Sequence, residues 1–388
     1  MTQHQFFIEE MAFTPDSHAV QAGQFDVKSM PRPYRVSWDN SSNPFTKVNE
    51  QLAQNDKNIL LIDEKLLTLY AGNIQAPVDR TIAVPATETF KTIDGVKLVF
   101  DFMFERGFTK GEKLIVVGGG IIQDVGAFTA ACYKRGINWV YFPTTLLSMC
   151  DSCIGAKSGV NYKDAKNQMA LFSAPTEVTI NPAFLSTLSE QDLKSGIGEM
   201  LKLCIIAGEP YLATYDQHVS NGKVSHPDGY QMLVMTALSI KRAIVEVDEF
   251  EVNYRKSLNY GHTLGHAIEA MSNYRIPHGV AVTIGMILVN ELSHRHQLMT
   301  GEVKQKLNDM CLSLLDEPTK LLMSSISATN VLSLLKNDKK TEGASIKFVM
   351  VKQPGQVKFA TMTLNQSLQS EIEMIIKQYF DKKCSAVA

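Results

Sequence analysis

Short, continuous apolar runs alternate with longer amphipathic stretches over residues 58–145. The apolar runs, which we expect to be strands, are NILLID (58–63), TIAVPA (81–86), KLIVVGGG (113–120) and WVYFPTT (139–145). Segments with helical periodicity lie between them, near residues 91–106 and 122–135. Apolar strands separated by helices are typical of a parallel sheet with helices on both faces. This pattern predicts an α/β domain over residues 57–188.

The pattern changes on both sides of this domain. After it, long amphipathic segments show few strand signals before SIKFVMV at 345–351, so we expect a mainly helical domain over residues 189–388. Residues 1–56 are polar and irregular, although FDVKSM (25–30) and YRVSW (34–38) alternate like short strands. We interpret residues 1–56 as an N-terminal extension that leads into the sheet.

Length and composition limit the class of protein. A chain of 388 residues exceeds the about 250–300 residues that a single core usually reaches, which favours two domains. A formal net charge of -2 and a hydrophobic content of 45% indicate a globular protein. Its overall charge would not attract nucleic acid or an anionic membrane. The six cysteines are scattered, the N-terminus has no basic and apolar leader, and no run approaches about 20 apolar residues. We therefore expect a soluble cytoplasmic protein.

A glycine-rich turn follows the third expected strand. Gly118, Gly119 and Gly120 join that strand to a helix with Asp124 in its first turn. Three glycines allow the backbone to approach a ligand closely, and the helix N-terminus offers unpaired N–H groups to a diphosphate. The turn is a candidate dinucleotide site, but it is not the GxGxxG pattern, and an ordinary structural turn is an equal alternative.

Three further residues extend this candidate site. Asp63 closes the strand at 58–63, and a carboxylate at the carboxyl end of a strand can reach a ribose or a nicotinamide-side group. Glu88 and Lys91 stand three residues apart at the junction of a loop and a helix. They are either ligand contacts or the solvated start of that helix.

Three histidines in the second half raise the question of a metal site. His262 and His266 stand four residues apart on an expected helix and share one face, while His278 lies in a loop before the next helix. Each is a metal ligand, a substrate contact or an ordinary polar residue. Glu199 lies at the start of another apolar helix, where a carboxylate either caps the helix or binds a cation. Two imidazoles and one carboxylate would leave open positions on an ion, as in catalytic zinc sites. Thr263 excludes the HExxH metalloprotease motif.

Candidate anion contacts are numerous in the same sequence. Taken singly, most are expected to be solvated surface side chains; they are Arg135, Lys157, Lys166, Asn167, Lys202, Lys241, Arg255 and Asn259. Lys157 and Lys166 differ, because CDSCIGAKSGVNYKDAKNQ (150–168) is a small-residue loop of the kind that surrounds a phosphate with donors. CDSC (150–153) is also a CxxC motif, whose cysteines we interpret as packing residues rather than a redox pair.

Together these residues resemble a known family. The matching segments run in one order from about residue 58 to 351 and include GGGIIQD (118–124), KRG (134–136), FPTTLL (142–147), DSCIGAKSGVN (151–161), KN (166–167), GEMLK (198–202), RKSLNYGHTLGHAIE (255–269), PHG (277–279) and NDKK (337–340). The set is similar to 3-dehydroquinate synthase and the wider sugar phosphate cyclases. The resemblance implies an N-terminal Rossmann-like NAD-binding α/β domain, a C-terminal mainly helical metal-binding domain, and a homodimer.

The resemblance also implies roles for individual residues. The zinc ligands would be Glu199, His262 and His278, with Co2+ also possible, whereas His266 would reach the phosphate of the substrate. The implied NAD contacts are Asp63, Glu88, Lys91, Gly119, Gly120, Asp124, Thr144, Thr145, Lys166, Phe184 and Thr187. The implied substrate contacts are Asp151, Lys157, Asn167, Lys202, Lys241, Arg255, Asn259, His266 and Lys340 or its neighbour Lys339. Arg135 would cross from the neighbouring subunit to the phosphate.

The activity that the resemblance implies is a cyclisation of a small sugar phosphate. Enzymes of this kind oxidise the substrate transiently with NAD, eliminate phosphate, return the hydride and close a carbocycle by an intramolecular aldol step. The residue types at Arg255, Asn259 and His266 favour a 3-dehydroquinate synthase that acts on 3-deoxy-arabino-heptulosonate 7-phosphate.

Departures from the usual motifs leave alternatives open. GAK (155–157) and HGV (278–280) replace GGK and HGE. A secondary-metabolite cyclase that makes 2-epi-5-epi-valiolone, amino-dehydroquinate or 2-deoxy-scyllo-inosose is therefore the second interpretation. A polyol dehydrogenase of the glycerol dehydrogenase group is a third, and net NADH production without phosphate release would distinguish it.

Overall fold

The computed structural model describes residues 4–163, 165–326, 328–336, 341–342 and 345–380. The chain forms two compact units. The first, which we call the α/β unit, contains His18–Ser189 and Tyr230–Glu249. The second, the helical unit, contains Met1–Ser17, Glu190–Gly229 and Phe250–Ala388. Within the described ranges, no helix combines the length and the apolar character that a membrane span requires.

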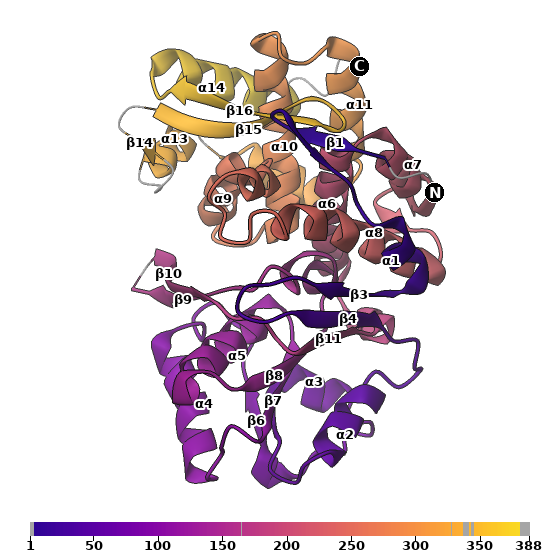
Figure 1. The fold of residues 1–388 in the computed structure, drawn as a ribbon. Coiled ribbons are helices and arrows are strands. Elements are labelled where there is room, and N and C mark those ends of the chain that lie inside the picture. The colour runs from indigo at the N-terminus through magenta and orange to yellow at the C-terminus, as the bar shows by residue number, and fades with distance from the viewer. Residues whose placement is uncertain (1–3, 164, 327, 337–340, 343–344, 381–388) are drawn as a thin grey trace. The chain divides into compact units, whose positions relative to one another are not determined.

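A seven-stranded sheet forms the centre of the α/β unit (Figure 1). In spatial order its strands are β3 (Gln24–Val27), β4 (Tyr34–Trp38), β11 (Glu177–Ile180), β8 (Asn138–Pro143), β7 (Lys113–Gly118), β5 (Ile59–Asp63) and β6 (Thr81–Val84). All neighbouring pairs are parallel except β3 and β4, which are antiparallel. The central strands β5, β7 and β8 are buried along nearly their whole length. The predicted parallel sheet of an α/β domain is confirmed.

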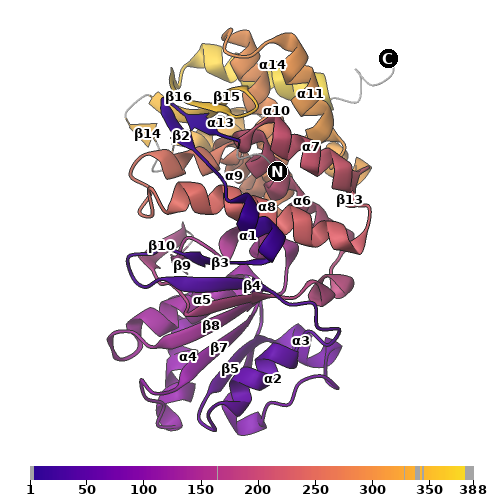
Figure 2. The same cartoon turned by 45° about the vertical axis from the view of Figure 1, so that its right-hand side comes forward.

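Helices cover the two faces of this sheet, with α4 and α5 on one side and α2 and α3 on the other (Figure 2). The helical segments are α1 (Ser17–Ala22), α2 (Thr46–Ala53), α3 (Glu64–Leu69), η1 (Val78–Arg80), α4 (Ile93–Glu105), α5 (Gly120–Cys132), η2 (Tyr133–Arg135), the π-helical turn η3 (Ser148–Ser152) and η4 (Pro182–Thr187). The expected loop at 150–168 is wrong. That segment forms part of η3 and a hairpin of β9 (Lys157–Tyr162) and β10 (Ala165–Phe172), whose backbone groups pair with each other.

The first 56 residues are divided between the two units. β3 and β4 belong to the sheet of the α/β unit, whereas β1 (Phe6–Ile8) and β2 (Met11–Phe13) belong to a sheet of the helical unit. β4 pairs with β11, and β1 pairs with β16 (Gln356–Thr363), so both segments are held by strands that lie far away in the sequence. The α/β unit also includes most of α8 (Pro227–Val245). The compact units divide the chain after residues 17, 189, 229 and 249, whereas the sequence pattern led us to expect divisions after residues 56 and 188.

The helical unit is built around α10, a helix that is buried on all sides from Gly279 to Ser293. Its helices are α6 (Glu190–Ala207), α7 (Glu209–His218), η5 (Tyr254–Asn259), α9 (His262–Met271), α10 (His278–Arg295), α11 (Gly301–Leu312), α12 (Glu317–Met323), α13 (Ala328–Lys336) and α14 (Gln366–Phe380). α10 packs against α6, α9, α11 and α14 (Figure 1). This arrangement explains the apolar character of α10 around its whole circumference.

A five-stranded sheet accompanies these helices. Its order is β14 (Thr341–Glu342), β15 (Ser345–Gln353), β16, β1 and β2. A two-residue hairpin pair, β12 (Val219–Ser220) and β13 (Lys223–Val224), lies separately. The sequence predicted the strand at 345–351, which is part of β15, but not its partner β16 or the addition of the N-terminal strands. β16 combines apolar, charged and hydroxyl side chains, so its signal alone does not separate it from a loop.

Candidate functional site

A carboxylate and three imidazoles meet where α6, α9 and α10 approach one another in the helical unit. Glu199 Oε1 lies 3.7 Å from His262 Nε2 and 3.4 Å from His278 Nε2. One ring nitrogen each from His262, His266 and His278 lies within 4.8 Å of the others, so this cluster could hold a metal ion. Glu199 is fully buried in the second half of α6, so the interpretation of this residue as a helix cap is wrong.

Close contacts between helix backbones bring these side chains together. A Cβ on Gly279, the second residue of α10, would lie 1.9 Å from the carbonyl oxygen of Ser195 on α6. A Cβ on Gly285 would lie 2.0 Å from the carbonyl oxygen of Gly261, directly before α9. A side chain at either glycine would separate the helices, because no Cβ approaches backbone this closely. The small residues therefore set the distances between the candidate ligands.

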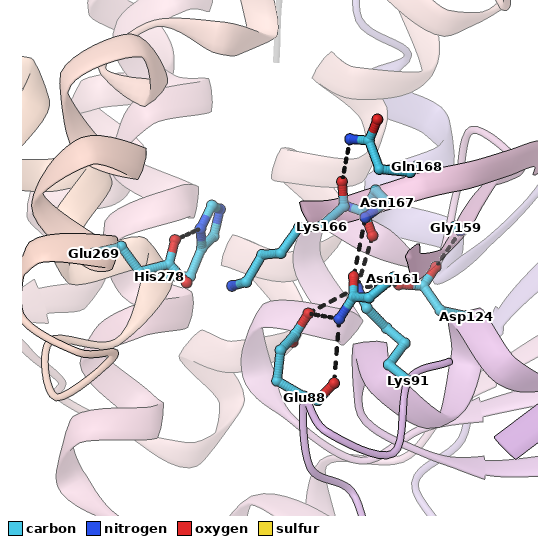
Figure 3. Close-up of polar contacts among 10 residues, drawn as sticks. All are labelled: Glu88, Lys91, Asp124, Gly159, Asn161, Lys166, Asn167, Gln168, Glu269 and His278. Carbon is cyan, nitrogen blue, oxygen red and sulfur yellow. Dashed lines mark hydrogen bonds and ion pairs between the residues drawn. The ribbon is translucent and has the colours of Figure 1, made fainter. Parts of the chain in front are cut away.

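Each of the two imidazoles that face Glu199 has a further partner on its other ring nitrogen. His278 Nδ1 lies 3.1 Å from Glu269 Oε2 (Figure 3), and His262 Nδ1 lies 3.2 Å from the carbonyl oxygen of Tyr260. Such partners fix the tautomer and direct Nε2 toward a metal. Sequence reasoning missed Glu269. The signal was its position seven residues after His262, two helical turns along the same face of α9.

The charges around this cluster balance closely. Burial alone would lower the pKa of His278, but its contacts with Glu199 and Glu269 outweigh burial and raise that pKa to about 9. Lys202 Nζ lies 2.5 Å from Glu199 Oε2, and both residues are buried. The buried Glu199 carboxylate therefore contacts both the Lys202 ammonium and the His278 imidazole, and a cation bound there can replace protons. The nitrogen and oxygen donors suit Zn2+ or Co2+.

In the α/β unit, most predicted dinucleotide contacts lie at the carboxyl edge of the sheet. They are Asp63 at the end of β5, Gly119 and Gly120 after β7, Thr144 and Thr145 after β8, and Phe184 and Thr187 after β11. Because these strands are parallel and β11, β8, β7 and β5 are consecutive in the sheet, their ends meet at one edge. Open α/β sheets bind dinucleotides at this edge. Asp63 additionally caps α3 by accepting a hydrogen bond from the Lys65 amide at 3.1 Å.

Lys91 is the centre of a buried polar cluster next to this edge (Figure 3). Its Nζ lies 3.0 Å from Asp124 Oδ2, 3.5 Å from Glu88 Oε1 and 2.8 Å from Asn167 Oδ1. Lys91 is only 6% exposed, so the interpretation as a solvated helix start is wrong for Lys91, whereas the Glu88 side chain is partly exposed. Burial would lower the pKa of Lys91, but Asp124 and Glu88 outweigh it and raise the pKa. Lys91 therefore stays charged, and it joins the helix that follows the glycine turn to β10.

A pocket of about 400 Å³ lies beside this cluster, within the α/β unit. It is lined by Asp124, Lys157, Ser158, Gly159, Asn167, Ala170, Leu171 and Phe172. Lys157 is exposed on β9, whereas the Asn167 side chain on β10 accepts the hydrogen bond from Lys91. Lys166 precedes Asn167 on β10 and is partly exposed. The hairpin thus places cationic and amide donors around a pocket, as expected of a phosphate site.

The predicted substrate contacts are distributed over both units. The α/β unit carries Arg135, Asp151, Lys157, Asn167 and Lys241, and the helical unit carries Lys202, Arg255, Asn259 and His266. Lys339 and Lys340 lie outside the described residues. The expectation of a solvated surface side chain holds for Arg135, which is exposed.

Three of the cationic side chains are instead buried, which contradicts the surface interpretation. Lys202, Lys241 and Arg255 are 1%, 6% and 3% exposed. Lys241 Nζ contacts Asp151 twice, at 2.7 Å from Oδ1 and at 2.6 Å from the main-chain oxygen. Charged side chains are rarely buried unless they are paired or bind a ligand. The ion pairs with Glu199 and Asp151 account for the burial of Lys202 and Lys241.

The CxxC cysteines, Cys150 and Cys153, are buried thiols, as the packing interpretation predicted. The Cys153 thiol lies 3.3 Å from the main-chain oxygen of Met149, and burial raises its pKa to about 12. A thiol with a raised pKa is a poor redox nucleophile.

Comparisons with known proteins agree with this architecture. Two family models match consecutive parts of the chain: 3-dehydroquinate synthase N-terminal over residues 81–195, and 3-dehydroquinate synthase C-terminal over residues 196–341. The chain is 34% identical over 323 residues to the 3-dehydroquinate synthase of Streptococcus equi subsp. equi (strain 4047), which covers 81% of this chain and 88% of that protein.

Two solved structures share the fold. A crystal structure of 2-deoxy-scyllo-inosose synthase complexed with carbaglucose-6-phosphate, NAD+ and Co2+ has a TM-score of 0.78 at 20% identity and covers 90% of this chain and 99% of that one. The 2-epi-5-epi-valiolone synthase from Streptomyces hygroscopicus subsp. jinggangensis 5008, with NAD+ and Zn2+ bound, has a TM-score of 0.74 at 22% identity and covers 92% and 99%. At these sequence identities, the two structures support a shared fold and carry no conclusion about a shared function.

Proposed function

Because the chain belongs to the 3-dehydroquinate synthase family of sugar phosphate cyclases, we propose that it converts 3-deoxy-arabino-heptulosonate 7-phosphate to 3-dehydroquinate and phosphate. The observation that carries this proposal is the 34% identity to a 3-dehydroquinate synthase over 81% of the chain. Arg255 supports it further, because a buried guanidinium is a permanent positive charge that suits the carboxylate of this substrate.

The junction of α6, α9 and α10 fits a divalent ion. In our proposal Glu199, His262 and His278 are the ligands, while Glu269 and the carbonyl of Tyr260 hold the two imidazoles with Nε2 toward the ion. Zn2+ is the proposed ion and Co2+ a substitute, since this donor set suits both. His266 is more exposed than the ligands and is assigned to the phosphate of the substrate.

The carboxyl edge of the seven-stranded sheet is the proposed NAD site. The glycine turn at Gly119 and Gly120 would approach the diphosphate, and Lys91 with Asp124 holds the β9–β10 hairpin beside it. When bound, the ion supplies a Lewis acid for the hydroxyl groups of the substrate and NAD+ supplies a reversible hydride acceptor that acidifies the neighbouring C–H. The residues of the chain bind and orient the substrate for this chemistry.

The cationic and amide side chains are proposed to bind the phosphate and stabilise its charge as it leaves. Lys157 and Asn167 line the pocket of about 400 Å³, and Asp151 holds Lys241 in one position. Because Lys241 and Arg255 are held by burial, they are preorganised, which lowers the cost of reordering them during the reaction. Arg135 is exposed on η2 and is proposed to reach the phosphate bound by a second subunit of a homodimer.

A substrate panel tests the proposed function. Purified protein with NAD+ and Zn2+ is offered 3-deoxy-arabino-heptulosonate 7-phosphate, a heptulose 7-phosphate and glucose 6-phosphate, and phosphate release is measured with identification of the cyclic product. We expect 3-dehydroquinate from the first compound and little turnover of the others. A valiolone-type or inosose product would reject the assigned substrate but retain the cyclase chemistry. NADH accumulation from a polyol without phosphate release would reject the cyclase itself.

A further inference from the structure

A chain of hydrogen-bonded polar side chains, most of them buried, begins next to His262 in the helical unit. The hydroxyl of Tyr260, two residues before His262, donates a hydrogen bond to Asn290 Oδ1 on α10. Asn290 Nδ2 donates to Asn308 Oδ1 on α11 at 2.9 Å, and Asn308 Nδ2 donates to the hydroxyl of Tyr379 on α14 at 2.9 Å. Three helices are therefore joined to the segment that carries a proposed metal ligand.

The far end of this chain is anchored by charge. The Tyr379 hydroxyl donates to Glu291 Oε1 at 2.6 Å, and the same oxygen lies 2.9 Å from Lys304 Nζ. Glu291 is 2% exposed, so the hydrogen bond from Tyr379 is made to a desolvated carboxylate and is strong. Because the Tyr379 hydroxyl donates its one hydrogen to Glu291, it accepts the hydrogen bond from the Asn308 amide. Asn308 Oδ1 is then the acceptor for Asn290 Nδ2, and Asn290 Oδ1 is the acceptor for the Tyr260 hydroxyl.

The near end of the chain holds the backbone that orients His262. The carbonyl oxygen of Tyr260 is the partner of His262 Nδ1, at 3.2 Å. His278 is oriented by the side chain of Glu269, but His262 depends on a main-chain oxygen whose position follows that of Tyr260. Gly261, between Tyr260 and His262, has a left-handed φ of 78°, and its backbone packs against α10. The buried Tyr260 hydroxyl adds a second anchor on the other side of this carbonyl, again to α10.

Stability alone does not account for such a chain. Asn290, Asn308 and Tyr260 are each 0% exposed, and buried polar groups gain little over apolar groups of the same shape even when every hydrogen bond is made. A buried network does favour one arrangement, because a small shift of a helix leaves a donor or an acceptor unsatisfied. In this protein the favoured arrangement determines the position of Tyr260.

We propose that Tyr260, Asn290, Asn308 and Tyr379 form a positioning chain through which the C-terminal helix α14 fixes His262 in the orientation of a metal ligand. This inference rests on the proposed function, since it takes His262 as a ligand. Loss of a direct partner of a metal ligand typically lowers metal affinity by about 10- to 100-fold. The positioning chain acts on the partner of His262 and not on His262 itself. We therefore expect the Zn2+ dissociation constant to increase by about 10-fold in Tyr260→Phe and by about 3-fold in Tyr379→Phe.

The experiment uses the purified full chain after removal of metal with a chelator. Zn2+ affinity is measured by competition with a chromophoric chelator, the visible spectrum is recorded with Co2+, and the urea midpoint of each metal-free variant is determined. Tyr215→Phe is the matched control, because Tyr215 lies in the same unit, is 3% exposed, and has a hydroxyl without a hydrogen-bond partner among the described residues. The control removes a buried tyrosine hydroxyl that does not belong to the positioning chain.

The inference predicts weaker Zn2+ binding and an altered Co2+ spectrum in Tyr260→Phe and Tyr379→Phe, with wild-type values in Tyr215→Phe. It is overturned if Tyr260→Phe changes the urea midpoint but binds Zn2+ as tightly as wild type, since its role would then be structural. It is equally overturned if Tyr215→Phe weakens binding as much as Tyr260→Phe. A wild-type protein that binds neither ion would reject the proposed metal site, and this inference together with it.

Discussion

Replacement of Lys91 by methionine tests whether the buried cluster in the α/β unit behaves as an ion pair. Methionine keeps the length and most of the apolar stem of lysine but removes the charge. The substitution leaves the Asp124 carboxylate without its partner at 3.0 Å and removes the donor that contacts Asn167 at 2.8 Å. Burial raises the pKa of Asp124 even with Lys91 present, so its carboxylate is costly to keep charged there.

The structure sets the size of the effect. Removal of one partner from a buried ion pair costs about 3–5 kcal/mol, because the remaining charge is desolvated and uncompensated. The Asp124 side chain is 21% exposed and that of Glu88 is 33% exposed, so water relieves part of this cost. We therefore expect Lys91→Met to lower the free energy of unfolding of the α/β unit by about 3 kcal/mol. Asp124→Asn in the same background should recover at least about 1 kcal/mol, as expected for residues in direct contact.

The assay follows urea unfolding by tryptophan fluorescence. The chain has 2 tryptophans, and both Trp38 and Trp139 lie in the α/β unit, so the signal reports on this unit. Wild type, Lys91→Met, Asp124→Asn and the double variant complete a double-mutant cycle. If the losses from the two single variants simply add within about 0.5 kcal/mol, Lys91 and Asp124 are not coupled and the account of this cluster is refuted.

Three further predictions concern the metal site. Glu199→Ala and His262→Ala should each lose bound Zn2+ and activity together, whereas His266→Ala should keep the metal and lose turnover. Elemental analysis and activity assays of the three variants check this. Loss of metal in His266→Ala would reverse the role assigned to His266. At pH 7 Zn2+ should displace about one proton from His278, because its pKa of about 9 keeps the imidazole protonated in the metal-free protein. Zn2+ affinity should therefore rise with pH up to about 9. Calorimetry in two buffers of different ionisation enthalpy measures the released proton, and binding heats that do not depend on the buffer would contradict the prediction. Glu269→Gln should lower the pKa of His278 and reduce the number of protons released, and an unchanged number would show that Glu269 does not set this pKa.

The sequence predicted the elements whose pattern is local. Continuous apolar runs identified β5, β7 and β8, and their order along the chain led to a parallel sheet with its carboxyl ends at one edge. The spacing of His262 and His266 predicted a shared helix face, which α9 provides. Glu199 was a candidate cap or ligand from the sequence, and the resemblance to a family then assigned it to the metal together with His262 and His278.

The features that could not be predicted depend on pairing between distant segments. The burial of Lys91 arises from contacts with Asp124 and Asn167, and neither the helix start nor the glycine turn reveals them in isolation. The pairing of β1 with β16 joins segments that lie far apart in the sequence, and the alternation noted at 25–30 and 34–38 concerns β3 and β4 rather than β1. The anchoring of Tyr260 by Asn290 likewise depends on how α10 packs.

The most direct test of the central claim is phosphate release from 3-deoxy-arabino-heptulosonate 7-phosphate by protein from which both the dinucleotide and the metal have been removed. We predict no turnover by the stripped protein, none when NAD+ or Zn2+ is returned alone, and full turnover without net NADH when both are returned. Phosphate release at the full rate by the stripped protein would contradict the account.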